Sequence, residues 1–271
     1  MKTVISCSRR TDIPAFHYQW LQKSLLDKKV ELINSYNNKP YTIDLSPEKV
    51  HSIILWSKNY KHLMNDIGEL AKYNLYFNFT INGYGKDIEP AVPNIEEACE
   101  QAKALSERFS PDQIMWRFDP IMFTPTETKE KRLETYKILV DKLSGYGIRN
   151  CTISFVLLYE KTKNCFNKNN IDCIMPSDDE KVDFAKSLSE IARNNSISVY
   201  TCSEPLLETI EGLNKAHCVD GSRLEHLFGD KISHSKDSGQ RLACGCTKSS
   251  DIGSYNQRCH HSCTYCYAQR F

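Results

Sequence analysis

Three cysteines near the end of the chain have a spacing that could hold a metal centre. They are Cys259, Cys263 and Cys266, in the run Cys-His-His-Ser-Cys-Thr-Tyr-Cys. Thiolates this close in sequence can occupy three corners of one metal site, and a cluster held by three cysteines leaves one iron open to a non-protein ligand. We expect His260 and His261, inside the same run, to support the site or face solvent rather than to bind the metal.

The twelve cysteines are unevenly distributed along the 271 residues. Seven are scattered through the chain before the C-terminal segment, where we expect most of them to be small buried hydrophobic residues. The other five fall between Cys244 and Cys266, in a segment poor in aliphatic residues and rich in Gly, Ser, Asn and His. Such a segment cannot fold around an apolar core of its own, so we expect a coordinated metal to order it.

Two of those five cysteines, Cys244 and Cys246, form a C-x-C pair that can bind one metal. Further ligands could come from Cys218, Cys202 or Cys7. The pair therefore suggests an auxiliary cluster or metal. The alternative is a tight turn around Gly245 that carries two reduced thiols.

Along the chain, short β-rich apolar runs alternate with amphipathic helical patterns, as in repeated βα units around a parallel sheet. The predicted strands are Thr3–Cys7, Glu31–Asn34, Ile53–Trp56, Leu75–Ile81, Ile114–Phe118, Cys151–Leu157 and Ile197–Cys202. The predicted helices are Tyr18–Asp27, Lys61–Tyr73, Ile95–Phe109, Lys129–Leu143 and Asp178–Asn194. Asn94 and Ser177, each followed by acidic residues, predict capped starts for two of these helices.

Six or seven such units predict an α/β fold, a complete or partial (β/α) barrel with a cysteine-rich, cluster-binding C-terminal segment. A doubly wound open sheet is the alternative. No linker or repeat divides the chain, so we expect a single domain over residues 1–271, with a barrel body at 1–217 and a cysteine-rich tail at 218–271.

Polar side chains follow many of the predicted strands, where parallel α/β folds bind their ligands. A rim of basic and acidic groups suits a ligand that carries carboxylate, amine or phosphate groups. The candidates for substrate or cofactor contacts on this rim are Arg9, Arg10, Lys58, Arg117, Asp119 and Glu204.

The cluster motif and its continuation Tyr267-Ala268 resemble the motif of the radical S-adenosylmethionine (SAM) enzymes, in the form typical of the spore photoproduct lyase group. The strand end Leu55–Asn59 and the sequence Glu89-Pro90 are similar to segments of that group. The whole pattern also resembles a bacterial family assigned to that neighbourhood, which carries the cluster motif at its C-terminus.

The resemblance implies that Cys259, Cys263 and Cys266 bind a [4Fe–4S] cluster whose open iron chelates SAM. One-electron reduction would then give a 5′-deoxyadenosyl radical that abstracts hydrogen from a substrate, which could be a nucleic-acid lesion. It implies an electron donor, either a reductase or a flavodoxin or ferredoxin, and it places Tyr265 near the adenine. Lys58, Arg117, Asp119 and Glu204 are then the candidates for catalysis, and Arg9 and Arg10 for cofactor binding.

The sequence departs from the superfamily in the order of its parts. The cluster loop normally follows the first strand, whereas here only five residues follow Cys266. We expect a permuted barrel in which the tail folds back beside the strand Thr3–Cys7. The usual glycine-rich SAM-binding stretch is not found in the sequence.

Composition limits the alternatives. With 35 basic and 34 acidic residues, the chain does not suit binding to nucleic acid by bulk charge, although a local basic patch could still grip it. No apolar run is long enough for a membrane span and the first residues do not form a signal peptide, so we expect a cytoplasmic protein. Two other readings stay open: a (β/α) barrel hydrolase or isomerase with a structural zinc site in its tail, and a nucleic-acid-binding module with a zinc tail.

Overall fold

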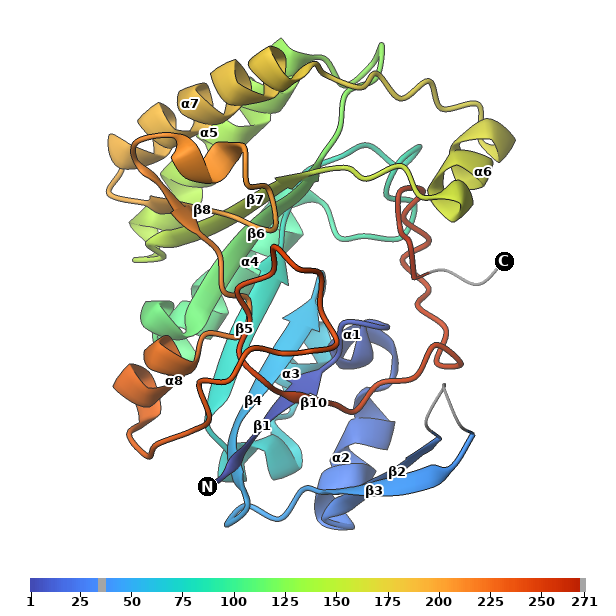
Figure 1. Ribbon diagram of the computed structural model, residues 1–271, viewed down its shortest axis with the longest axis vertical. Coiled ribbons are helices and arrows are strands. Elements are labelled where there is room, and N and C mark those ends of the chain that lie inside the picture. The colour runs from blue at the N-terminus through green and yellow to red at the C-terminus, as the bar shows by residue number, and fades with distance from the viewer. Residues whose placement is uncertain (34–37, 269–271) are drawn as a thin grey trace.

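The computed structural model describes residues 1–33 and 38–268, and it shows one eight-stranded parallel sheet with helices around it (Figure 1). The strands lie side by side in the order β10, β1, β4, β5, β6, β7, β8, β9. Their bounds are β1 Thr3–Cys7, β4 Val50–Ser57, β5 Leu75–Thr80, β6 Ile114–Ile121, β7 Asn150–Phe155, β8 Ser198–Thr201, β9 Leu213–Lys215 and β10 Ser250–Asp251.

Six strands from β4 to β9 follow one another across the sheet in chain order. The order does not reverse within the body, so the strand order of a doubly wound sheet is not found there. A complete barrel is not confirmed either: across the described residues the sheet is open, with β9 and β10 at its two edges. The α/β fold with a parallel sheet is confirmed.

One predicted strand lies outside this sheet. The run Glu31–Asn34 was expected to be part of a βα unit, but β2 (Lys29–Ile33) pairs antiparallel with β3 (Pro40–Asp44) in a separate two-stranded hairpin. Its residues are mostly exposed or half-buried, so it lacks the apolar run of a central strand. The last predicted residue of this run lies outside the described residues.

The helices agree with the predicted patterns at four places, and the structure adds short ones that the patterns missed. Both predicted caps are present as capping boxes, with Asn94 accepting from Glu97 N and Ser177 accepting from Glu180 N. The bounds are α1 Ile13–Phe16, α2 Tyr18–Leu26, α3 Lys61–Asn65, α4 Ile95–Arg108, α5 Lys129–Gly145, α6 Glu160–Lys168, α7 Asp178–Arg193 and α8 Gly221–Phe228.

The predicted helix Lys61–Tyr73 is broken into α3 and a 3₁₀ turn, Gly68–Lys72. Gly68 has a φ of +49°, which an α-helix cannot include. Side chains of α2 also form hydrogen bonds with the backbone carbonyls at the break: Tyr18 donates to Asp66 O and Gln22 donates to Ile67 O. The helical pattern is therefore interrupted by tertiary contacts.

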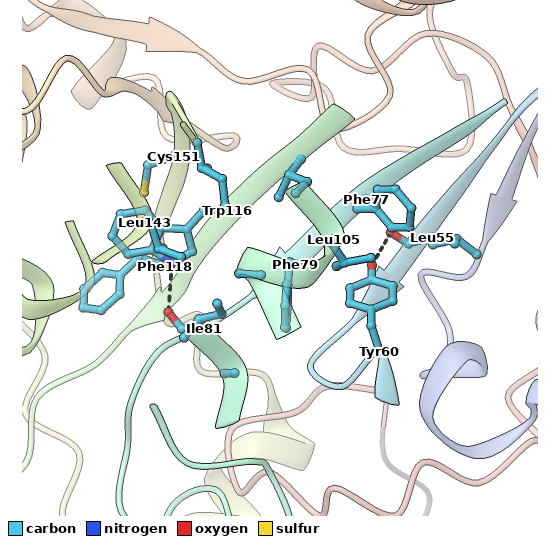
Figure 2. Close-up of a cluster of buried hydrophobic side chains, with 14 of the residues drawn as sticks. Leu55, Tyr60, Phe77, Phe79, Ile81, Leu105, Trp116, Phe118, Leu143 and Cys151 are labelled. Atoms are coloured by element: carbon cyan, nitrogen blue, oxygen red, sulfur yellow. Dashed lines mark hydrogen bonds between the residues drawn. The ribbon is translucent and has the colours of Figure 1, made fainter. Parts of the chain in front are cut away.

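Alternation along the strands divides their side chains between two faces of the sheet. On one face, Phe77, Phe79, Trp116 and Phe118 pack with buried residues of the helices in one continuous core. Figure 2 shows part of this core, including the hydrogen bond from Trp116 Nε1 to Ile81 O at 3.0 Å. Trp116 and Phe118 thus contribute to the packing of this core.

The C-terminal segment covers part of the other face. The strand residues that alternate with the core residues belong to a second hydrophobic cluster. It contains Val4, Ile54 and Met115 of the sheet together with Val219 and Leu224 of the tail. The tail also enters the sheet itself, because β10 pairs in parallel with β1 (Figure 1). The expectation that the tail lies beside the first strand is confirmed.

Within the described part of the chain, the structure shows no helix that is both long and apolar enough to cross a membrane.

Candidate functional site

A cavity of roughly 1000 Å³ lies at the carboxyl ends of the strands, and most predicted site residues line it. Its walls include every predicted metal-binding cysteine, namely Cys218, Cys244, Cys246, Cys259, Cys263 and Cys266. They also include Arg9, Arg10, Lys58, Arg117, Asp119 and Tyr265. Glu204 is the exception: it is not among the described residues that line the cavity, and burial raises the pKa of its carboxyl.

The loop that carries Cys259, Cys263 and Cys266 begins at the edge strand β10, which pairs with β1 and carries a carboxylate that binds several groups there. Asp251 accepts hydrogen bonds from Ser6 Oγ at 3.0 Å, Ser8 Oγ at 2.6 Å and Arg9 N at 2.9 Å. The backbone continues the pairing, with Ile252 N donating to Ser6 O at 3.0 Å. These bonds bring two ends of the chain together at the cavity.

A second carboxylate holds the middle of the cysteine loop. Asp12 lies 2.9 Å from His261 Nε2 and accepts from Ser57 Oγ at 2.7 Å and Lys58 N at 2.9 Å. The other ring nitrogen of His261 lies 3.1 Å from Ala91 O. Both ring nitrogens thus face an acceptor within hydrogen-bond distance, so neither is left for a metal. His260 is exposed.

Lys58, Glu89 and Tyr265 form a buried polar cluster against this loop. Lys58 Nζ lies 2.8 Å from Glu89 Oε1, and Tyr265 Oη donates to the same carboxylate oxygen. Asn82 Nδ2 donates to it at 3.2 Å. Burial would raise the pKa of Glu89, but the Lys58 ammonium and these hydrogen bonds hold it below its ordinary value.

The thiols of the cysteine loop differ in the charged groups that lie near them. Burial raises the pKa of Cys259 to about 12, and Asp12 adds to this. Burial also raises the pKa of Cys263, against the opposing pull of the Lys58 ammonium. A bound metal would remove the proton from each thiol.

In the described residues, no three His, Cys, Asp or Glu side chains already surround one point as ligands of a single ion would.

A second group of cavity cysteines lies near Arg117, which was predicted to act in catalysis. Arg117 Nη1 donates to Cys218 Sγ at 2.9 Å, and its other branch pairs with Asp119. Cys202 Sγ lies 3.7 Å from Cys218 Sγ. Hydrogen bonds from Cys202 and Cys246, together with Arg117, hold the pKa of the buried Cys218 thiol well below its usual value.

Several cavity-lining groups have buried polar atoms without a hydrogen-bond partner. These are Arg9 Nη2, Thr11 Oγ1 and Ser203 Oγ. Burying such atoms unpaired costs free energy, so they are positions where a polar ligand would be stabilised. Arg10, by contrast, is held by Gly253 O at 2.8 Å and lies over the Tyr255 ring.

Four residues of the site were not singled out from the sequence: Asp12, Asn82, Glu89 and Asp251. Asp12 and Asn82 lie in the polar runs after predicted strands, so their positions carried a signal, and Glu89 belongs to the segment that resembles the spore photoproduct lyase group. Nothing in the sequence near Asp251 marks it, because its partners are more than 240 residues away.

Comparison with known proteins gives one match. The family model described as a domain of unknown function, DUF1848, matches residues 4–268. No curated protein and no solved structure matches the chain.

Proposed function

We propose that this protein, which belongs to the DUF1848 family, is a radical SAM enzyme whose cluster is held by Cys259, Cys263 and Cys266. The proposal rests on one observation: the C-x3-C-x2-C motif lies at the carboxyl ends of the strands of a parallel sheet. All three cysteines line the cavity there, which is the position where parallel α/β folds bind their cofactors.

The order of the strands supports a permuted partial barrel. In the radical SAM enzymes the cluster loop follows the first strand. Here the loop follows β10, and β10 is the edge strand directly beside β1. Across the sheet, β10 therefore takes the place of a first strand, although it comes last in the chain.

The residues present fit a [4Fe–4S] cluster and SAM by their chemistry. Three thiols are soft ligands of the kind that iron–sulfur clusters use. His261 is the buried histidine of the motif, and its two ring nitrogens are already hydrogen-bonded to Asp12 and Ala91 O. The unpaired atoms of Arg9, Thr11 and Ser203 offer donors to a cofactor with carboxylate and hydroxyl groups.

Held by Cys259, Cys263 and Cys266, a [4Fe–4S] cluster would supply the one-electron reduction of SAM on which hydrogen abstraction from a substrate depends. The protein contributes orientation and exclusion of water. Asp12 and His261 fix the cysteine loop against β1 and β4, and Lys58 with Glu89 places a neutral, buried ion pair beside Cys263. Tyr265 is held between Glu89 and the Tyr84 ring, whose centroid is 6.0 Å away.

Iron and sulfide analysis of anaerobically reconstituted protein tests the cluster directly. We expect about four irons and four sulfides per chain, lost in the variant Cys259→Ser/Cys263→Ser/Cys266→Ser. Cys99→Ser is the matched control, because Cys99 is a buried thiol on α4 outside the cavity. Stoichiometric zinc without sulfide at these three cysteines would contradict the proposal and favour the zinc-stapled alternative.

A further inference from the structure

Four cysteines outside the cluster motif meet at one place in the fold. Cys202 follows β8, Cys218 follows β9, and Cys244 and Cys246 lie in the tail. All four line the cavity and belong to the apolar cluster on the sheet face opposite the main helices. All four thiols are reduced.

The sulfur atoms form a connected chain. Cys202 Sγ lies 3.7 Å from Cys218 Sγ, and the Cys246 thiol interacts with those of both Cys218 and Cys244. Their backbones are pinned together: Thr247 N donates to Val219 O at 3.0 Å, and Ala216 N donates to Thr201 O at 2.8 Å. Three separate chain segments thus deliver four soft ligands to one cavity wall.

Glycine at position 245 is what allows this approach. A side chain there would stand 2.9 Å from the His217 ring and 3.1 Å from Ala216 O, closer than ordinary contacts permit. Only a residue without a Cβ lets Cys244 and Cys246 pass so close to Ala216 and His217, in the segment that leads from β9 to Cys218.

The polar groups around these sulfurs are donors. Arg117 Nη1 donates to Cys218 Sγ at 2.9 Å, and Val219 N donates to Cys246 Sγ at 3.4 Å. The Arg9 side chain also interacts with the Cys246 thiol. Donors of this kind stabilise thiolates bound to metals, and the two guanidinium groups offset the excess negative charge of four thiolates around a divalent ion.

We propose that Cys202, Cys218, Cys244 and Cys246 form a tetrathiolate site for one zinc ion. In a tetrahedral zinc site with 2.3 Å bonds, neighbouring sulfurs are about 3.8 Å apart. The separation of Cys202 and Cys218 matches this edge. In a [4Fe–4S] cluster each thiolate binds a different iron, so paired sulfurs stand farther apart.

The proposed ion would link the tail to the sheet. The four thiols do not yet surround one point in the structure as it stands. A cysteine side chain has a single rotatable bond, so each sulfur can be redirected by a rotamer change without moving the backbone. The site would then join the ends of β8 and β9 to the segment that precedes β10. This role is independent of the proposed radical chemistry.

Titration with Co²⁺ alone tests the site in a background without the cluster motif, Cys259→Ser/Cys263→Ser/Cys266→Ser. In the reduced, metal-stripped protein we expect one equivalent of Co²⁺ to give the intense visible bands of a tetrahedral tetrathiolate, displaced by Zn²⁺. Adding Cys218→Ser or Cys246→Ser should abolish these bands, and adding Cys99→Ser should leave them unchanged. Arg117→Gln should weaken Co²⁺ binding about 10- to 100-fold, as loss of a group that orients a metal ligand does.

X-ray absorption at the zinc edge of the wild-type protein is a second measurement. It does not depend on the folding of a variant. Four sulfur neighbours at about 2.3 Å are expected. The proposal is overturned if the cluster-free background binds no Co²⁺, if it yields iron with inorganic sulfide, or if Cys202 and Cys218 are recovered as a disulfide. None of these results depends on whether the protein cleaves SAM.

Discussion

Two buried carboxylates organise the residues around the cysteine motif. Asp12 is only 8% exposed and binds groups from three places in the chain, and Glu89 is 2% exposed and pairs with Lys58. Buried charges are tolerated only when they are paired and hydrogen-bonded, and removal of one partner leaves the other unsatisfied. These two groups should therefore be more sensitive to substitution than the exposed charges on the helices.

His261→Gln tests whether Asp12 positions the cysteine loop. Glutamine cannot reach both Asp12 and Ala91 O, so we expect the free energy of unfolding to fall by about 1–3 kcal/mol and the iron content to drop. The matched control is His260→Gln, since the neighbouring histidine is exposed. Equal iron content in the two variants would show that His261 does not support the loop.

Glu89→Gln should change how stability depends on pH. The Lys58 ammonium keeps the pKa of Glu89 below its ordinary 4.5 despite burial, so the folded state binds this proton less readily than the unfolded state does. The carboxylate therefore stabilises the fold above the ordinary value, and this contribution is lost as the pH falls below it.

Chemical unfolding across that range measures the effect. We expect the wild-type protein to lose stability more steeply than Glu89→Gln on acidification, and the variant to be about 3–5 kcal/mol less stable near neutral pH. Parallel curves would mean that Glu89 carries no such linkage.

At the scale of elements, the two-residue strand β10 connects the site to the fold. It is short and polar, and its contacts with β1 come from Asp251 and from the buried Ile252 that follows it. Loss of this anchor should free the loop that carries the cysteine motif while leaving the helix-covered core intact.

Asp251→Ala removes three hydrogen bonds between the tail and residues at and just after the end of β1. We expect a loss of about 1–3 kcal/mol in unfolding free energy and faster proteolytic cleavage within residues 252–268. Asp230→Asn is the control, because the Asp230 side chain lies in the same tail and forms an exposed ion pair with Lys2, which contributes little, and asparagine tolerates a positive φ at this position. Identical cleavage in both variants would argue against the anchor.

The elements differ in how far the sequence predicts them. β1 has its predicted bounds and the capping boxes mark α4 and α7, because apolar periodicity and capping side chains are local signals. β9 and β10 have three and two residues and no apolar pattern, so no local signal exists. The pairing of Asp12 with His261 spans 249 residues and follows only from the fold.

At the scale of the whole molecule, the open sheet has one face covered by helices and the other partly covered by the tail (Figure 1). This leaves the cavity at the strand ends between the body and the tail. Most of the predicted rim residues do converge there, because the carboxyl ends of parallel strands share one edge. The gathering of the cysteines into two groups on that cavity was only partly predicted, because it depends on how the tail folds back.

Binding of SAM in this cavity should stabilise the whole chain. A ligand at one hundred times its dissociation constant adds about 2.7 kcal/mol when it binds only the folded state. We expect SAM to raise the melting temperature of the reconstituted protein, and to raise it much less in Cys263→Ser. An equal shift in the two proteins would show that SAM binds independently of the cluster.

Formation of 5′-deoxyadenosine from SAM is the most direct test of the proposed radical chemistry. We predict that the reconstituted protein, reduced with dithionite under anaerobic conditions, releases 5′-deoxyadenosine, even slowly and without added substrate. The variant Cys259→Ser/Cys263→Ser/Cys266→Ser should release none. A reconstituted protein with a full complement of iron and sulfide that binds SAM but never cleaves it under reduction would contradict the account.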